Sequence, residues 1–466
     1  MKFWRTIFTF VPGTALFFMD QTILPVALPA IQNELGATDT ELQWSVNAYI
    51  LAIAIFLLIG GKLGDSKGLR KIWGMGIVGF TVSSILCGLS ITPDMLIWAR
   101  FLQGAFVAFM IPPQNSLLRH MFPATSLGRA MGCVVSIGSI FLMLGPIVGG
   151  YLTETLSWRW IFWVNVPIGV IGLWTALTCW PSPKSVKSPI DKLGFCYFAT
   201  GVGALTIFFM QVTEWGWTSP LSLTILFISL IFLSLLFLRE KKVPHPFLEI
   251  SLFKRPLFAA INISVSTAQI FMMVGVFWLL YFQQVLHYTT MQAGVLSFIS
   301  AFPVIFASPL AGYLSDRLGP KLPVAIGYLF LIYTCFFLGF FPMPSLASLV
   351  IALFIFGMGI PFLLTPSFSK AITTVPPTKT AIAVGTLITL RMVAGSMGLA
   401  CMYLLQSSVY TRWLPVVGAK EAYITSFSTL HFALGFLIIV SFAFSFLLHT
   451  RKSGHELPEF PGEGWD

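Results

Sequence analysis

The chain has 466 residues, of which 56% are hydrophobic and 9% are charged. Soluble proteins carry about a quarter charged residues, so this composition excludes a soluble globular protein. The apolar residues, together with the 39 glycines, could form some fourteen membrane spans of roughly 20 residues each. The six cysteines are scattered through apolar stretches, which excludes a disulfide framework and a CxxC metal site.

The hydrophobic runs predict an all-α polytopic membrane protein with fourteen transmembrane helices. The runs form a set of six, a pair and a second set of six: 7–31, 44–61, 72–91, 94–116, 129–152 and 159–180; 193–212 and 220–238; then 256–285, 292–314, 321–341, 345–369, 380–405 and 425–448. The connecting stretches, of which 181–192, 239–255, 370–379 and 406–424 are the longest, leave no room for a soluble catalytic domain. We therefore expect no enzyme.

The same runs divide the chain into four parts. We expect an N-terminal six-helix bundle (1–180), a linker that carries two inserted helices (181–250), a C-terminal six-helix bundle (251–450) and a tail (451–466).

Basic residues are placed very unevenly between the two sides of the predicted membrane. With both termini inside, 22 of the 27 Lys and Arg residues fall in inside loops, three in outside loops and two within spans. This asymmetry follows the positive-inside rule and predicts that both termini are cytoplasmic. Topology and anionic lipid explain the net charge of +10, and no clustered basic face points to nucleic acid.

A repeat links the two sets of six helices. GKLGDSKGLRK at 61–71 resembles GYLSDRLGPK at 312–321, and both copies follow the second span of their set. Two parallel halves of six helices are typical of secondary transporters. We expect the repeat to form a conformational gate that contacts helix ends of the other half, and the alternative is a turn that merely obeys the positive-inside rule. The gate residues are Gly61, Asp65, Gly68, Arg70, Lys71, Asp316 and Arg317.

Few ionisable residues lie within the spans. Each costs on the order of 2.5–3.5 kcal/mol at a helix centre, so each is a functional candidate. Asp20 is the one mid-span acid, and Arg100 and Arg391 are the bases. We expect Asp20 to bind a proton or cation with Arg100 tuning it, although a buried pair that serves packing is the alternative. For Arg391, function and packing both stay open.

The segment GSIFLMLGPIVGGYL at 138–152 combines small residues with a proline. Gly145, Gly149 and Gly150 allow a neighbouring helix to approach closely, and Pro146 interrupts the hydrogen-bond ladder. We expect a helix that packs tightly or bends against its neighbour, with a plain packing motif as the alternative.

These motifs resemble the major facilitator superfamily, specifically its fourteen-helix drug:proton antiporters of QacA and EmrB type. MDQTILPVALPAI at 19–31 is similar to the first-helix motif LDxTIVNVALPxI, with Pro25 in place of the usual asparagine. Arg100, Gln103 and Gly104 match RxxQG, and the segment at 145–150 matches the antiporter signature GPxxGG.

The resemblance implies a multi-pass protein of the bacterial cytoplasmic membrane in which Asp20 and Arg100 couple transport to the proton. The proton is then the coupling ion and no cofactor is expected. A periplasmic adaptor is a possible partner, as in the EmrB-like branch, and we expect a monomer.

The predicted function is proton-coupled export of lipophilic, cationic drugs or other amphipathic compounds by alternating access, hence multidrug efflux and drug resistance. The expected cavity residues are Trp44, Asn47, Tyr49, Gln269, Trp278 and Gln283. The second half offers no mid-span acid, so a neutral or anionic substrate stays open. The alternatives are a dedicated metabolite or siderophore exporter or importer and a non-transporting membrane receptor. Isolated histidines supply neither a catalytic residue nor a metal site.

Overall fold

The computed structural model describes residues 2–183, 191–243, 253, 256–288, 290–375 and 380–450, and within these ranges the regular elements are helices. The predicted tail 451–466 and the linker segments 184–190 and 244–252 lie outside the described residues. The helices before the linker are α1 (Lys2–Phe8), α2 (Val11–Leu35), α3 (Asp39–Lys67), α4 (Leu69–Gly88), α5 (Pro93–Ala108), α6 (Ile111–Met121), α7 (Ala124–Thr155), α8 (Trp160–Trp163) and α9 (Asn165–Cys179). The inserted pair is α10 (Lys192–Trp215) and α11 (Pro220–Glu240). The helices after it are α12 (Pro256–Gln284), α13 (Thr290–Ala301), α14 (Val304–Leu318), α15 (Lys321–Phe340), α16 (Leu346–Thr373), α17 (Thr380–Val417) and α18 (Ala419–Thr450).

Thirteen helical stretches among the described residues are long and apolar enough to cross a membrane. Three of them join neighbouring helices, namely α5 with α6, α8 with α9, and α13 with α14. The last stretch covers residues 383–445 and contains both α17 and α18. The all-helical, polytopic architecture expected from the sequence is therefore confirmed.

Local sequence sets several helix starts. Thr38 caps α3 in a capping box with Glu41, since each side chain accepts from the other residue's backbone N–H. Thr92 caps α5 and Ser219 caps α11, each followed by a proline in the first turn. These caps satisfy backbone donors that the first helical turn leaves free.

Two expected boundaries were wrong. The first span does not begin at residue 7, because the short helix α1 ends at Phe8 and α2 begins at Val11. The stretch 406–424 is helical rather than a loop, since α17 runs to Val417 and α18 begins one residue after Gly418. Gly418 has φ 81°, a left-handed conformation that glycine adopts without strain. Residues 411–421 are exposed, so this extension needs no apolar face to persist.

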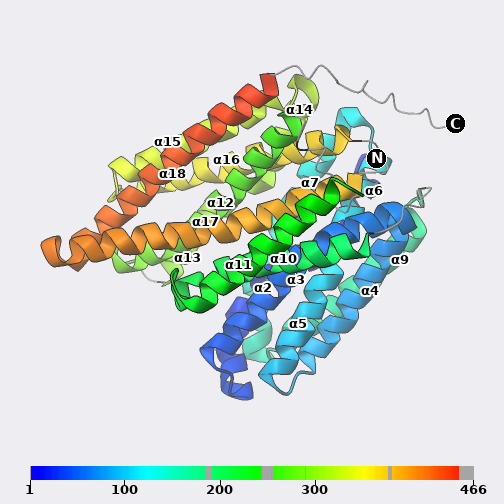
Figure 1. Cartoon of the computed structure of the whole chain (residues 1–466), viewed down its shortest axis with the longest axis horizontal. Helices are drawn as coiled ribbons and strands as arrows, with labels where there is room; N and C mark the ends of the chain where they lie inside the picture. Colours follow the sequence, from blue (N-terminus) through cyan, green and yellow to red (C-terminus); the bar gives the residue numbers. More distant parts are fainter. Residues whose placement is uncertain are drawn as a thin grey trace.

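The helices form two groups that meet at one end of the molecule. Figure 1 shows α2–α5 and α9 on one side and α12, α15, α16 and α18 on the other. We call these groups the first half (α1–α9) and the second half (α12–α18). The most extensive contact between them joins α7 to α14, with α3 against α17 as the next.

One end of the bundle carries the basic repeat loops, and we call it the basic end. It contains the α3–α4 junction, the α6–α7 junction, the α14–α15 junction and the C-terminal end of α16. At this end, Ile372, Val384 and Ile388 of the second half are buried in one apolar cluster with Leu57 and Leu117 of the first half.

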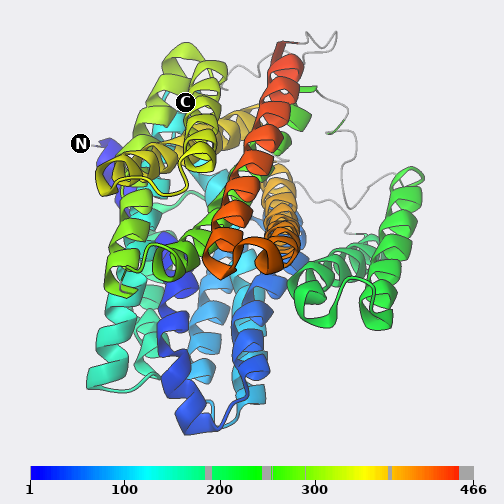
Figure 2. The ribbon, with the colours of Figure 1, turned by 90° about the vertical axis from the view of Figure 1, so that its left-hand side faces the viewer.

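The inserted helices form a hairpin at the edge of the molecule (Figure 2). α10 packs on α3 of the first half and on α17 of the second, through Phe198 and Val202 near Ala54 and through Phe208 near Ala400. A bidentate ion pair closes the base of the hairpin, with Arg239 Nε and Nη2 each 2.8 Å from a carboxylate oxygen of Asp191. The hydrogen bonds from Arg239 lower the pKa of the Asp191 carboxyl. The hairpin therefore covers the line along which α3 and α17 meet.

Candidate functional site: a buried polar network and its helices

Asp20 and Arg100 form a fully buried ion pair between α2 and α5. Arg100 Nη1 lies 2.7 Å from Asp20 Oδ2, and the two side chains are 2% and 0% exposed. Asp20 lies about 14 Å along α2 from Val11, near mid-depth of a hydrocarbon core about 30 Å thick. The two charges that the sequence singled out are thus brought together in the interior of the first half.

Gln103 completes the pair as a bridging amide. Its Oε1 accepts from Arg100 Nη1 at 2.6 Å, while its Nε2 donates to Asp20 Oδ1 at 3.3 Å. The same Nε2 donates to Ser84 Oγ at 3.1 Å, and Ser84 in turn donates to the Phe162 carbonyl at 2.9 Å. A buried charge pair needs such additional hydrogen bonds to offset its desolvation.

The network reaches α9 through Asn165, whose Nδ2 donates to Ser84 Oγ at 3.0 Å. Sequence reasoning missed both Ser84 and Asn165 as site residues. Nothing local distinguishes Ser84 from the neighbouring Ser83, but Asn165 is a polar residue within the apolar run 159–180. That placement was the available signal for Asn165.

α3 covers the ion pair from a third side. The Tyr49 ring lies 4.3 Å from Arg100 Cζ in a cation–π arrangement, and the Ser45 carbonyl accepts from Arg100 Nε at 3.2 Å. Tyr49 is 1% exposed. A Cβ on Gly104 would come within 2.3 Å of the Tyr49 carbonyl oxygen, so glycine at 104 permits this approach of α5 to α3. Tyr49, expected to face a substrate, instead shields Arg100 in this conformation.

The helix with the antiporter-like signature, α7, packs tightly on α2. A Cβ at Gly145 would meet Thr22 Oγ1 at 2.1 Å, and one at Gly149 would meet the Ile23 carbonyl oxygen at 2.9 Å. Gly150 points to a looser region, 3.8 Å from Val26. The two glycines four residues apart therefore serve close approach to the helix that carries Asp20.

Pro146 is connected to the same helix by a hydrogen bond. Proline has no backbone N–H, so the carbonyl four residues earlier, that of Leu142, loses its helical donor. Thr22 Oγ1 donates to this Leu142 carbonyl at 2.7 Å. The bend site of α7 is thereby tied to α2 only two residues after Asp20. The sequence motif includes Thr22 without revealing this partner.

At the basic end, Asp316 of the repeat crosses to the other half. Its two carboxylate oxygens accept from the backbone N–H groups of Gly128 and Arg129 at 2.9 Å each, in the second turn of α7. α7 and α14 approach closely here, since a Cβ on Gly132 would lie 2.3 Å from the Ser308 carbonyl oxygen. These charge-assisted hydrogen bonds hold the C-terminal end of α14 against α7.

Arg119 was not among the predicted gate residues, yet it also crosses between the halves. Its Nη1 donates to the carbonyls of Ile372 and Val375 at 2.6 and 2.8 Å and to Thr380 Oγ1 at 2.7 Å. It lies at the end of α6 and so binds the C-terminal end of α16, where free carbonyls attract a cation. The positive-inside pattern placed Arg119 at this end without indicating its partners.

The other predicted gate residues lie in their own half. Gly61 is buried within α3, and Asp65 lies two residues before the end of that helix. Gly68 has φ 106°, which permits the α3–α4 turn. Arg70 donates to the Trp180 carbonyl at 3.1 Å and therefore caps α9 of the same half.

The last two gate residues are outside the contact between the halves. Lys71 is exposed on α4. The guanidinium of Arg317 lies 4.6 Å from the Tyr313 ring of its own helix.

Of the predicted cavity residues in the first half, Trp44 faces the inserted hairpin. With the Gln211 amide oriented to suit both neighbours, Trp44 Nε1 donates to Gln211 Oε1 at 3.3 Å and Gln211 Nε2 donates to Glu214 at 3.1 Å. Asn47 is part-buried one turn further along α3.

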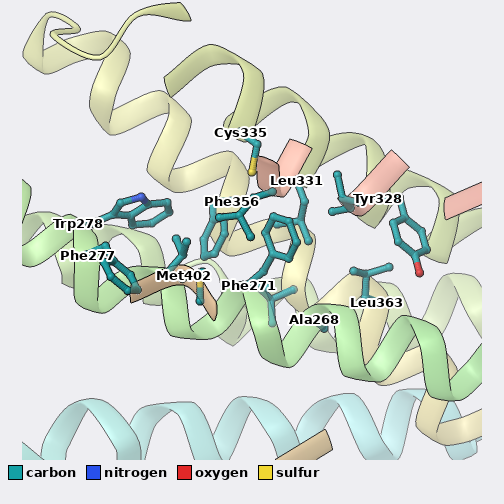
Figure 3. Close-up of a cluster of buried hydrophobic side chains, with 14 of the residues drawn as sticks. Ala268, Phe271, Phe277, Trp278, Tyr328, Leu331, Cys335, Phe356, Leu363 and Met402 are labelled. Atoms are coloured by element: carbon teal, nitrogen blue, oxygen red, sulfur yellow. The ribbon is translucent and has the colours of Figure 1, made fainter. Parts of the chain in front are cut away.

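In the second half, Trp278 belongs to the apolar core drawn in Figure 3. Its Nε1 donates to His431 Nε2 at 2.9 Å and its ring lies 4.6 Å from that of Phe356. Gln283 is part-buried near the end of α12, and Gln269 is nearly buried at the middle of that helix. The six expected cavity residues thus have different surroundings, and a shared substrate cavity stays a prediction.

Groups of three or more side chains that could hold a metal ion are absent from the described residues. The site thus consists of a buried pair of opposite charges between helices of the first half. Separate hydrogen bonds join the two halves at the basic end.

Comparison with known proteins agrees with this architecture. The family model described as Major Facilitator Superfamily matches residues 10–399. The chain is 28% identical over 433 residues to the tetracenomycin C resistance and export protein of Streptomyces glaucescens, which covers 90% of this chain and 80% of the relative. It is 29% identical over 417 residues to the riboflavin transporter RibZ of Clostridioides difficile, covering 88% of this chain and 90% of the relative.

A solved structure shares the fold. The crystal structure of the human organic anion transporter MFSD10 (TETRAN) superposes with a TM-score of 0.65 at 15% sequence identity, covering 94% of this chain and 99% of that one. At this identity the likeness concerns the fold alone.

Proposed function

The chain belongs to the Major Facilitator Superfamily, and from that premise we propose that it is a proton-coupled exporter of small amphipathic compounds that works by alternating access. The observation that carries this proposal is the Asp20–Arg100–Gln103 network, which places a carboxylate at mid-depth among groups that compensate its charge. Relatives support the export direction, since one of them is named a resistance and export protein.

The proposed topology has fourteen crossings with both termini in the cytoplasm of a bacterial cell. The thirteen apolar stretches become fourteen when the last is divided at Gly418 into α17 and α18. The basic loops then face the cytoplasm, as the positive-inside rule requires.

This topology is tested by labelling in a cysteine-free background. Thr218→Cys and Lys241→Cys lie at opposite ends of α11, and both positions are exposed. A membrane-impermeant maleimide should label Thr218→Cys from outside the cell and Lys241→Cys only after the membrane is opened. Equal labelling of both positions from outside would contradict the fourteen-crossing topology.

Protonation of Asp20 supplies the proposed coupling. The ionised carboxylate neutralises Arg100, whereas a protonated Asp20 would leave the arginine charge uncompensated in a buried site. Arg100 and Gln103 would then need other partners, and α2 and α5 would favour a different packing. Because α2 is also bonded to the bend of α7 through Thr22 and Leu142, a change at Asp20 acts on the helix that reaches the gate.

Contacts between the halves would hold the cytoplasmic side closed in this conformation. Asp316 and Arg119 each bind helix ends of the opposite half at the basic end. Alternating access requires these contacts to break when the transporter opens inward.

Transport is tested in proteoliposomes with an imposed pH gradient, using efflux of an amphipathic dye as the measurement. Asp20→Asn should abolish gradient-driven transport while exchange down a dye gradient persists. Asp94→Asn is the matched control, because Asp94 is an exposed carboxylate in the first turn of α5. Unchanged pH-driven transport by Asp20→Asn would overturn the coupling role.

Dedicated transport of one metabolite is the second candidate. Its support is the relative named a riboflavin transporter. The same liposomes separate the two functions, since a dedicated transporter would move one compound of a structurally varied panel and a drug exporter would move several.

A further inference from the structure

Arg391 lies in α17, a helix that packs against α3 of the first half and α12 of the second half. It is about 16 Å along the helix from Thr380, roughly half the thickness of the hydrocarbon core. Three residues before it, Ile388 packs in the cluster of the first half, while Leu387, four residues before it, packs in the core of the second half. Arg391 therefore occupies the border between these two faces of α17.

Its guanidinium has no partner within the part of the chain that the structure describes. Its buried Nε–H donates to no acceptor, and no ion pair or hydrogen bond joins the side chain to another described residue. The residue as a whole is part-exposed. Burying a charged group at this depth without a partner costs free energy. An unpaired arginine here therefore suggests that a ligand supplies the missing acceptor.

A second unpartnered polar group lies one helical turn away. Gly395 follows Arg391 by four residues on the same face of α17, and a Cβ there would lie 2.8 Å from Gln269 Cγ of α12. Gln269 Oε1 is buried without a hydrogen-bond partner in the described structure. Gln269 therefore packs on α17 one helical turn from Arg391, and its unpartnered atom is the acceptor Oε1.

An aromatic ring stands beside this pair. The Phe368 ring centroid of α16 is 5.9 Å from Arg391 Cζ. Phe368 packs against the apolar clusters of both halves and is itself only partly buried. An aromatic or otherwise apolar body held against Phe368 could present an acidic group to Arg391.

The charge balance of the interior favours an anion over a cation. Asp20, the mid-span acid, is fully buried and already paired with Arg100, so a cationic substrate could reach it only after Arg100 moves. The cationic substrate expected from the sequence depended on an accessible Asp20. Arg391, in contrast, is an interior charge without an ion-pair partner among the described residues.

We propose that Arg391, with Gln269 and Phe368, forms the binding site for the acidic group of an amphipathic organic anion, and this deepens the proposed export function on which it rests. A guanidinium binds a carboxylate or a phosphate through two parallel hydrogen bonds. Only Nε2 of the Gln269 amide can donate to the same group, since Oε1 is an acceptor, and the phenyl ring of Phe368 offers a surface for the apolar body. The substrate class is thus a weakly acidic, planar compound such as an aromatic carboxylate or an ionised phenol.

The test uses a pair of probes that share one ring system and differ by one negative charge. They are 7-diethylaminocoumarin-3-carboxylate and its neutral carboxamide, and their binding is followed by fluorescence with the full-length protein in nanodiscs of phosphatidylcholine. Wild type should bind the carboxylate at least about tenfold more tightly than the amide, the preference that one charged hydrogen-bonded contact can supply. Arg391→Gln should remove this preference while leaving the amide affinity within a few fold of wild type.

Arg412→Gln is the matched control, because Arg412 is an exposed arginine of the same helix. It should keep the wild-type preference. Arg391→Lys keeps the positive charge but lacks the planar guanidinium that binds a carboxylate through two hydrogen bonds. A reduced but measurable preference is therefore expected. This variant also replaces Arg391→Gln if the latter does not fold.

Three results would overturn the site: no preference in wild type, an undiminished preference in Arg391→Gln, or an equal loss in Arg412→Gln. A carboxylate affinity that disappears when phosphatidylglycerol is added to the nanodiscs would instead assign the arginine to a lipid headgroup. Because binding is measured without a pH gradient, failure of this site is distinguishable from failure of proton coupling, which Asp20→Asn tests in liposomes.

Discussion

Each half of the molecule contains a buried arginine, but the two arginines differ in whether their charge is paired. In the first half, Arg100 is surrounded by Asp20, Gln103, Tyr49 and the Ser45 carbonyl. In the second half, Arg391 lies over one aromatic ring, that of Phe368, and meets no acceptor among the described residues. Since both arginines lie near mid-depth, the membrane alone does not explain the difference.

The comparison indicates that the two arginines have different roles. A charge that is compensated within one half can change the packing of that half when its partner is protonated. A charge that lies between the halves without compensation is available to a molecule that enters from outside the protein. Four substitutions test the roles proposed for these buried groups and for the contacts linked to them, and they are given in decreasing order of expected effect.

Arg100→Gln should be the most damaging, because it leaves the Asp20 carboxylate buried without its cation. Removing one partner of a buried pair costs about 3–5 kcal/mol. The melting temperature of the purified protein should fall clearly. The double variant Asp20→Asn with Arg100→Gln should recover part of this loss, since both charges disappear together. Equal melting temperatures for wild type and Arg100→Gln would show that the pair does not compensate a buried charge.

Asp316→Asn should weaken closure of the basic end. It removes the negative charge from two hydrogen bonds to the second turn of α7, and hydrogen bonds to charged groups contribute about 1.5–3 kcal/mol each. The measurement is maleimide labelling of native Cys133, which is buried in α7 next to Gly132, in a background without the other cysteines.

Labelling of Cys133 from the cytoplasmic side should accelerate in Asp316→Asn. Arg317→Gln is the control, because its guanidinium lies on Tyr313 of its own helix and its loss should leave the rate unchanged. The same rate in Asp316→Asn as in wild type would exclude Asp316 from the gate.

Arg391→Gln should not destabilise the protein, in contrast to Arg100→Gln. The substitution removes an unpaired charge and leaves a polar group, so the melting temperature should stay within the range of a neutral surface change, about 0.5 kcal/mol, or rise. Thermal unfolding of the two arginine variants side by side measures this contrast. A loss as large as that of Arg100→Gln would mean that Arg391 has a structural partner.

Thr22→Val should have a similarly small effect on stability and a kinetic effect on transport. It deletes the hydrogen bond to the Leu142 carbonyl, and such bonds between membrane helices contribute about 0.6 kcal/mol on average. The transport rate in proteoliposomes should fall a few fold with little change in melting temperature. Thr22→Ser keeps the hydroxyl and should transport at the wild-type rate, and if it were as slow as Thr22→Val, the hydrogen bond would not be the cause.

Much of this architecture was accessible from local sequence. Long apolar runs predicted the helices, and the caps at Thr38, Thr92 and Ser219 lie where a hydroxyl precedes an apolar run. The prediction failed at 406–424 because polarity was taken as a sign of a loop. The end of α17 also carries exposed apolar residues such as Trp413, Leu414 and Val416, and the helix ends only where Gly418 adopts a left-handed conformation.

The cavity residues show where local reasoning stops. Tyr49 and Trp278 are aromatic residues on membrane helices. The sequence around them does not reveal that Tyr49 covers Arg100 and that Trp278 donates to His431. Which face of a helix is turned inward depends on the helices around it, and these are far away in the sequence.

The positions of the buried charges could be read directly from the sequence, because an ionisable residue in an apolar span is energetically costly and therefore stands out. The sequence identified Asp20, Arg100 and Arg391 as the groups that require explanation, and the basic loops as one end of the molecule. Only the tertiary structure decided which of these charges are compensated. Pairing requires atoms of separate helices to come within about 3 Å, and the packing of α2, α3 and α5 achieves this around Arg100, whereas the position of α17 between the halves leaves Arg391 without an acceptor.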